Sequence, residues 1–158
     1  MIRRPSSKVC TRDAAERWRR AQVGRVVFTN GVFDLIHPGH VDVLVAARDL
    51  GDALIVGINS DMSVRRLKGP ARPVRSAPER AIVLAALECV DSVVVFDEDT
   101  PLELIMALNP NVLVKGGDYT PETIVGAASV TAAGGEVVVV PLTPGHSTTR
   151  TVEKLRAI

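Results

Sequence analysis

Three short segments of the sequence carry side chains suited to binding phosphate groups. The first runs from Asn30 to His40 and ends in His37-Pro38-Gly39-His40. The second is a basic stretch from Lys68 to Ser76, and the third, Gly145 to Arg150, contains the remaining histidine, a serine and two threonines. Imidazole, ammonium and hydroxyl groups can all donate hydrogen bonds to anionic oxygens. The segments therefore predict a phosphate site if the fold brings them together.

The residues from His37 to His40 have the pattern of a helix start. Pro38 suits the first helical position, and Gly39 allows a ligand to approach the backbone closely. Free amides and the dipole at a helix start attract phosphate, to which two imidazoles could donate. Two other interpretations are a pair of surface histidines in a loop and a zinc site, since histidines at i and i+3 can share a metal. No third ligand has convincing spacing, so we expect no metal ligands in the chain.

The bulk composition limits the class of protein. A length of 158 residues suits one domain, and 46% hydrophobic against 23% charged residues is typical of a globular chain. The net charge of +1 gives no support for a nucleic-acid partner. No apolar run approaches the length of a membrane span and the start lacks a signal peptide, so we expect no membrane partner and a cytoplasmic location. Cys10 and Cys89 suggest neither a disulfide framework nor a zinc cluster.

Short apolar runs alternate with helical patterns along the chain. The expected strands are 25–29, 53–58, 92–96, 112–115 and 136–140. The expected helices are 11–22, 38–51, 60–67, 77–90, 100–109, 120–134 and a last one capped by Ser147 or Thr148. This alternation, with strands that are apolar on both faces, predicts an α/β fold: one doubly wound, Rossmann-like domain with a five-stranded parallel sheet. We expect residues 1–24 to be an N-terminal helical appendage and residues 25–158 to form the domain.

The candidate segments follow strand ends, where ligands bind in parallel sheets. A further segment, Lys115-Gly116-Gly117-Asp118-Tyr119, follows the strand 112–115. Two common phosphate motifs are absent: G-x-x-x-x-G-K-[ST], and G-x-G-x-x-G after the first strand. Their absence disfavours a P-loop protein and a dinucleotide-dependent dehydrogenase.

Four blocks of the sequence, in this order, resemble the cytidylyltransferase-like family of nucleotidyltransferases. The two signature blocks are Asn30-Gly31-x-Phe33-Asp34-x-x-His37-x-Gly39-His40 and Gly145-x-Ser147-Thr148-Thr149. The blocks Arg66 to Val74 and Leu113 to Tyr119 are similar to the branch of that family that adenylates heptose 1-phosphate, in the form that stands alone rather than fused to a sugar kinase. The similarity runs from about Val26 to the end of the chain.

The resemblance implies an enzyme that transfers AMP from ATP to a heptose 1-phosphate, releases pyrophosphate and supplies an activated heptose for cell-envelope glycans such as the lipopolysaccharide core. It implies Mg²⁺ bound with the triphosphate, and a homodimer. The catalytic residues would be His37, His40 and Lys68, with Lys68 on a mobile loop, and Arg72 would bind the sugar phosphate. The nucleotide-binding residues would be Asn30, Gly31, Phe33, Asp34, Gly39, Lys115, Gly116, Gly117, Asp118, Ser147, Thr148 and Thr149.

Several alternatives stay open at this point. One is cytidylyl transfer to glycerol phosphate or another alditol phosphate, and another is a non-catalytic regulator that binds nucleotide. The paired glycines after Lys115 favour the heptose substrate, and the presence of both histidines with Lys68 argues against the regulator. Asp34 could hold a water near the phosphates or simply position the turn.

Overall fold

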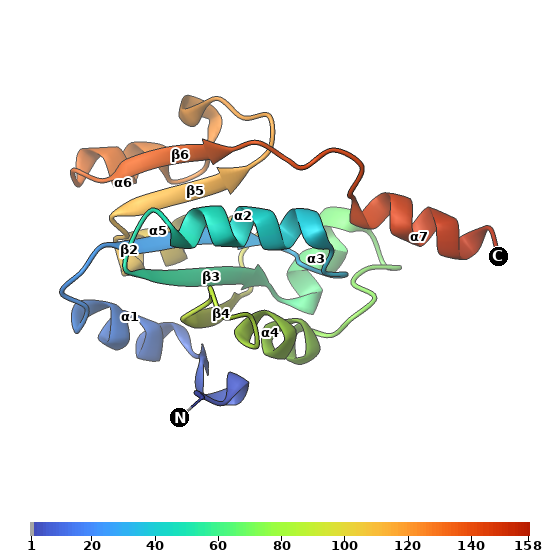
Figure 1. Cartoon of the computed structure of the whole chain (residues 1–158), viewed down its shortest axis with the longest axis horizontal. Coiled ribbons are helices and arrows are strands. Elements are labelled where there is room, and N and C mark those ends of the chain that lie inside the picture. Colours follow the sequence, from blue (N-terminus) through green and yellow to red (C-terminus); the bar gives the residue numbers. More distant parts are fainter. Residues whose placement is uncertain (1) are drawn as a thin grey trace.

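Six parallel strands form the sheet at the centre of the structure, a computed structural model that describes residues 2–158 (Figure 1). The strands are β1 (Val9–Cys10), β2 (Val26–Gly31), β3 (Ala53–Asn59), β4 (Ser92–Phe96), β5 (Val112–Gly116) and β6 (Glu136–Val140), in the order β1-β4-β3-β2-β5-β6. The chain runs from β2 outward to β4 and then crosses back to β5, beside β2. The strand order therefore reverses between β2 and β5, where ligands bind in folds of this kind.

The doubly wound parallel sheet predicted from the sequence is confirmed, with one strand more than expected. The additional strand, β1, pairs Val9 with Val93 and Cys10 with Val94 at the edge of the sheet. A strand of two residues is too short to show any periodicity, so the sequence pattern did not reveal it. Because β1 belongs to the main sheet, the first residues of the chain are joined to residues 25–158 by backbone hydrogen bonds.

Helices cover both faces of the sheet, and side chains alternate between the two cores. Val26 and Phe28 of β2 belong to one buried cluster, whereas Val27 belongs to the other. The first core lies under α1 (Arg12–Arg20), α5 (Leu102–Leu108) and α6 (Ala127–Ala132), and the second under α2 (Pro38–Arg48) and α4 (Ala77–Ala85). Each Val, Leu or Phe buried in this way stabilises the fold by about 1.5–3 kcal/mol. A rigid sheet results, with loops at its carboxyl edge.

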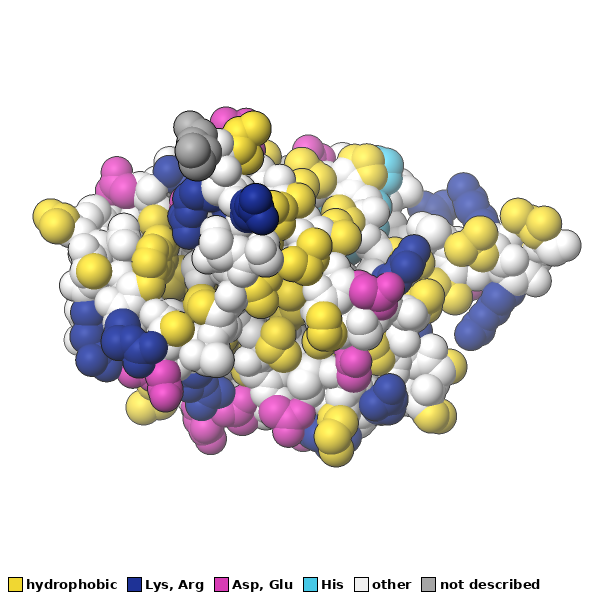
Figure 2. All heavy atoms as spheres, turned by 90° about the horizontal axis from the view of Figure 1, so that it is seen from below, with side chains coloured by type: hydrophobic (Ala, Val, Ile, Leu, Met, Phe, Trp, Pro, Cys, Tyr) yellow, Lys and Arg dark blue, Asp and Glu magenta, His cyan; other side chains and the backbone are white. Residues whose placement is uncertain are grey.

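Two further helices carry functional candidates to that edge. Helix α3 (Asp61–Lys68) follows β3, and Ser60 caps it by accepting a hydrogen bond from the Ser63 N–H. Helix α7 (Thr148–Arg156) begins after Ser147, whose Oγ accepts from the Arg150 N–H. Helix α7 projects beyond the sheet in Figure 1, buries none of its residues, and bears apolar and basic side chains in Figure 2. Thr148 and Thr149, in its first turn, line the cavity at this edge of the sheet.

The helix expected at 120–134 is interrupted. A 3₁₀ turn, Pro121–Thr123, is separated from α6 by Gly126, which has φ of +86°. A Cβ at this position would lie 2.7 Å from Ile105 Cδ1 on α5. Gly126 therefore allows both a left-handed backbone conformation and a close approach to α5. A helical sequence pattern indicates neither feature.

Candidate active site

A cavity of about 320 Å³ opens between the carboxyl ends of β2 and β5 and the first turns of α2 and α7. It collects residues from four of the segments singled out by sequence. The predicted residues that line it are Asn30, Gly31, Phe33, His37, Gly39, His40, Lys68, Lys115, Gly116, Ser147, Thr148 and Thr149. The strand order explains this convergence, because the ends of β2 and β5 are neighbours and α2 and α7 both begin there.

His37 and His40 are stacked at the start of α2. Their ring centroids lie 3.8 Å apart with 20° between the planes, and the His37 N–H donates to His40 Nδ1 at 3.3 Å. Because Nδ1 accepts, the proton of the neutral His40 ring is on Nε2. Burial first, and then the charges of His37 and Lys68, lower the pKa of His40 to about 4. His40 is therefore a neutral hydrogen-bond donor at physiological pH.

The third histidine, which the sequence placed in a candidate segment without assigning it a role, completes a row of imidazoles. His146 lines the cavity and lies parallel to His37, with 5.9 Å between ring centroids and 18° between planes. Burial, and secondarily the charge of His146, lowers the pKa of His37. A Cβ at Gly39 would lie 3.0 Å from His37 Cε1 and 3.3 Å from His146 Cβ. Gly39 thus provides the space in which the two rings pack over the helix start.

Two lysines face this cavity without a carboxylate partner. Within residues 2–158, neither Lys68 nor Lys115 has an Asp or Glu oxygen within 4.0 Å of its ammonium group. Burial lowers the pKa of Lys115, whose Nζ lies 5.7 Å from the centroid of the Tyr119 ring. The sequence analysis placed Lys68 in the loop after α3, but in the structure Lys68 is the last residue of that helix. No Asp or Glu side chain lines the cavity, so its charge is positive.

Asp34 and Arg72, both predicted ligands, do not line the cavity. The Arg72 Nε donates to Asp34 Oδ2 at 2.7 Å, and the backbone N–H groups of Val74 and Arg75 donate to the same carboxylate at 2.9 Å. Burial opposes ionisation of Asp34, but these donors outweigh it and lower its pKa. The Asp34 side chain is 1% exposed. Asp34 holds the loop after α3 against the turn after β2. Of its two possible roles, this favours positioning the turn over holding a water near the phosphates.

The glycine-rich segment after β5 contributes only partly to the cavity. Gly116 lines it, whereas Gly117 and Asp118 do not. Gly117 has φ of +130°, and its N–H donates to the Val140 carbonyl at 3.0 Å at the end of β6. Tyr119 and Leu142 form the wall at this point. Leu142 was missed because an apolar side chain in a loop gives no distinctive sequence signal, and Tyr119, although it ends a segment that the sequence singled out, was not among the predicted site residues.

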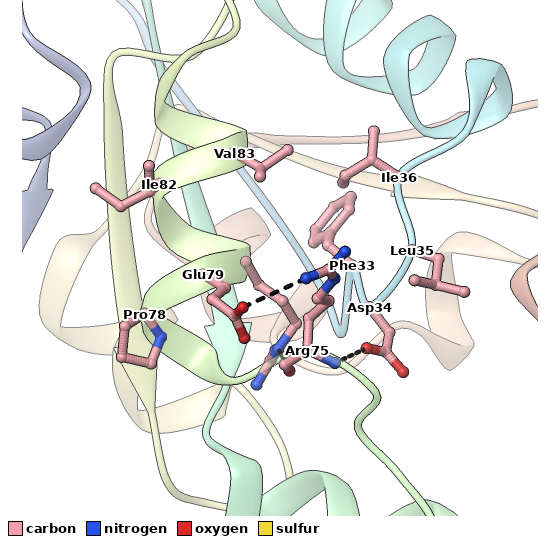
Figure 3. Close-up of a pocket in the computed structure, with 10 residues that line it drawn as sticks. Phe33, Asp34, Leu35, Ile36, Arg75, Pro78, Glu79, Ile82 and Val83 are labelled. Carbon is pink, nitrogen blue, oxygen red and sulfur yellow. Dashed lines mark hydrogen bonds and ion pairs between the residues drawn. The ribbon is translucent and has the colours of Figure 1, made fainter.

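A larger hollow of about 710 Å³ lies on the other side of the turn after β2, between that turn and α4. Figure 3 shows its wall: apolar side chains such as Ile36 and Ile82, with Arg75 paired to Glu79 and Asp34 accepting from the Arg75 N–H. Its charged side chains are thus already in ion pairs: Arg75 with Glu79, Asp34 with Arg72, and Arg80 with Asp61. A polyanion is better matched by the smaller cavity, where two lysines are free.

Two negative findings apply to residues 2–158. No helix in this range is both long enough and apolar enough to cross a membrane. No group of three or more His, Cys, Asp or Glu side chains in it is arranged to hold a metal ion.

The fold and this cavity define a nucleotide-binding α/β protein, and comparison with known proteins gives its family. The family model described as cytidylyltransferase-like matches residues 28–154. The chain belongs to this cytidylyltransferase-like family of nucleotidyltransferases.

Several similar curated proteins share one name. The bifunctional protein HldE of Hyphomonas neptunium is 59% identical over 139 residues, which cover 88% of this chain and 28% of the relative. The protein of the same name from Acidiphilium cryptum is 54% identical over 156 residues, covering 99% of this chain and 32% of the relative. The chain thus spans about a quarter to a third of the length of these relatives.

Solved structures share the fold. A lipopolysaccharide core biosynthesis protein from Thermoplasma volcanium matches with a TM-score of 0.61 and 25% identity, over 76% of this chain and 97% of that one. A pantoate–β-alanine ligase from Francisella tularensis matches with a TM-score of 0.63 at 14% identity, over 95% of this chain and 78% of that one. The second match shows likeness of fold alone.

Proposed function

We propose that the chain transfers AMP from ATP to a heptose 1-phosphate, releasing pyrophosphate and forming a nucleotide-activated heptose. The observation that carries this proposal is the cavity itself, where two lysines without carboxylate partners and a row of imidazoles surround the start of a helix. Such a site suits a triphosphate. The heptose, and a role in building the lipopolysaccharide core, are supported by the names of the similar proteins.

In the proposed reaction an oxygen of the sugar phosphate attacks the α-phosphorus of ATP. A phosphorus–oxygen bond forms there, and the bond to the β-phosphate oxygen breaks, so that pyrophosphate leaves with the electron pair. The attacking phosphate is mostly dianionic at neutral pH, since its second pKa is about 6, and needs no general base. The protein has to align two polyanions and stabilise the charge that moves to the leaving group.

The proposed roles follow from the donors that each residue has free. His37 and His40 donate as neutral imidazoles to the triphosphate, and Lys68 meets it from the end of α3. The Ser147 hydroxyl caps α7, while Thr148 Oγ1 donates to the Leu35 carbonyl at 3.4 Å. The amides of Thr148 and Thr149, in the first turn of α7, are therefore the donors proposed for the β- and γ-phosphates.

We place the base within the cavity, beside the ends of β2 and β5, and the sugar phosphate outside its lining, at Arg72. Asn30, Gly31 and Gly116 allow close approach of the nucleotide at the strand ends. Tyr119, 47% exposed, and Leu142, 58% exposed, offer a surface on which a base could stack. Arg72 uses only its Nε in the pair with Asp34, so its two terminal NH₂ groups are proposed to receive the sugar phosphate. Gly117 and Asp118 support the base site through the turn they form.

Mg²⁺ is proposed to enter as part of the nucleotide substrate. The cavity has no carboxylate, the ligand that Mg²⁺ prefers among side chains, so triphosphate oxygens and water would hold the ion. A chelator should abolish activity and Mg²⁺ should restore it. The purified protein should contain no stoichiometric zinc by elemental analysis. Tightly bound zinc would instead support the metal-site interpretation of His37 and His40.

We also infer a homodimer, and a division of the chain into residues 1–24 and the transferase domain 25–158. Helix α7 supports the first inference, because it buries no residue and Leu155 on it is 63% exposed. Light scattering of the purified chain tests it, with a monomeric mass as the contrary result. Removal of residues 1–24 tests the second: residues 25–158 should still fold, with reduced stability because β1 and the buried Ala15 of α1 are lost, and failure to fold would contradict the division.

Pyrophosphate release with a panel of triphosphates and acceptors tests the reaction. The expected result is release with ATP and a heptose 1-phosphate only. Release with CTP and glycerol phosphate would favour the alditol alternative. Nucleotide binding without any release would favour a regulator.

A further inference from the structure

Arg80 is the largest side chain that the described part of the chain buries completely. Its Nε donates to the Arg75 carbonyl at 3.0 Å, one terminal nitrogen donates to the Val32 carbonyl at 2.7 Å, and the other to Asp61 Oδ1 at 2.8 Å. Burying a charge costs free energy, and an apolar side chain could fill the same space at a lower free-energy cost. The planar guanidinium, however, can bind three different groups in fixed directions.

The three partners belong to three segments around the phosphate cavity. Val32 is in the turn after β2 and lines the cavity. Arg75 is at the end of the loop that connects α3 with α4, and Asp61 is the first residue of α3. Arg80 is therefore the point at which the turn, the loop and the start of α3 are joined.

On one side, this connection supports the imidazoles. Phe33, next to Val32, has φ of +49°, a left-handed conformation that is strained for an aromatic residue. Its ring packs against His40, with 5.1 Å between centroids. The bond from Arg80 to the Val32 carbonyl holds the turn in the shape that places Phe33 against His40.

On the other side, the connection supports Lys68. Asp61 and Lys68 are the two ends of α3, so the ion pair that fixes the first end restricts where the second can lie. The outer side of α3 has another ion pair, between Arg66 and Asp99 at 2.7 Å, and both of these side chains are substantially exposed. Exposed pairs contribute little to stability. The buried pair is the one expected to determine the helix position.

We propose that Arg80 is a positioning residue that sets the distance between Lys68 and the His37–His40 pair, so that both sides contact the same polyphosphate. The proposal rests on the proposed function only in taking the cavity as the triphosphate site. Arg80 itself contacts no cavity ligand, since it is fully buried. It acts through Asp61 and Val32.

The test is a double-mutant cycle on the full chain, with inorganic tripolyphosphate as the probe and affinity measured by titration calorimetry. Asp61→Asn removes the charge of the pair and leaves the two carbonyl bonds of Arg80. It should weaken binding by about five- to tenfold when Lys68 is present and by less than about twofold in a Lys68→Ala background. Asp99→Asn, which breaks the exposed pair on the same helix, is the matched control and should change affinity by less than about twofold in either background.

Arg80→Lys is the second variant, because it keeps the buried cation and loses the three-way geometry. It should weaken binding at least as much as Asp61→Asn and likewise lose most of its effect without Lys68. An equal effect of Asp61→Asn in both backgrounds, or no effect of either variant, would overturn the positioning role while leaving the proposed function intact. Failure of the unsubstituted chain to bind tripolyphosphate would overturn the triphosphate site, and with it both proposals.

Discussion

The imidazoles of His37 and His40 lie face to face, 3.8 Å apart, and are linked by a hydrogen bond from the His37 N–H to His40 Nδ1. Two protonated rings could not remain this close without strong repulsion, which agrees with the lowered pKa of both. The pair therefore presents donors without carrying charge. The positive charge of the cavity comes from Lys68 and Lys115, and this division of roles leads to four predictions.

His40→Ala should lower turnover by about two to three powers of ten, as removal of a charge-stabilising donor does. The affinity for ATP should change much less, because the lysines and the α7 amides remain. Steady-state kinetics with ATP varied at saturating acceptor separates the two effects. Near-normal turnover in a folded variant would show that His40 is only a structural residue of the turn.

The stability of the unliganded protein should fall as the pH is lowered from about 6.5 to about 4. The pKa of His40 is about 4 in the folded state, against 6.5 for an unperturbed histidine, so in this window the unfolded chain binds more protons. The loss should be about 1–3 kcal/mol, reduced from the ideal value because the ring borders solvent in the cavity. His37 adds a change of the same sign.

Urea denaturation at a series of pH values measures this slope. His40→Gln should flatten it, since the amide does not titrate. Identical slopes for the variant and the parent chain would mean that His40 does not have the lowered pKa.

Much of the site could be predicted because its residues follow strand ends, and a parallel sheet brings all such ends to one edge. Asn30 and His37, Lys115, and Ser147 come from three separate segments of the sequence, and the structure brings them to one cavity. The residue types identified the candidate segments, and the order of the strands in the sheet brings these segments together.

Pairing between charged residues could not be predicted in the same way. Asp34 and Arg72 are 38 residues apart, and each alone has the character of a ligand. Only their juxtaposition shows that they neutralise each other. Arg80, similarly, lies in an amphipathic helix where an arginine usually indicates a solvated face, yet it is fully buried.

Lys68→Ala should depress turnover strongly, whereas Arg75→Ala should change it little. Both residues were predicted to belong to one basic stretch, but only Lys68 lines the cavity. The Arg75 side chain pairs instead with Glu79 at 3.4 Å, and both are largely exposed. Turnover measured at two salt concentrations provides the comparison. Equal effects of the two substitutions would mean that the stretch supplies only a diffuse positive field.

The pH dependence of kcat/KM should show an acidic limb that belongs to the substrate and not to the enzyme. This parameter reports the ionisation of free enzyme and free substrates. The pKa of His40 is about 4 and that of His37 is lowered, whereas a sugar phosphate gains its second proton near pH 6. The rate should therefore fall as the pH drops through about 6, because the attacking dianion is lost.

An acceptor analogue with a different second pKa, such as a phosphonate or a thiophosphate, identifies the origin of the limb. The limb should move with the pKa of the analogue, both in the parent chain and in His37→Asn. A limb that keeps its position when the acceptor changes, and disappears in His37→Asn, would instead identify the imidazole as a general base.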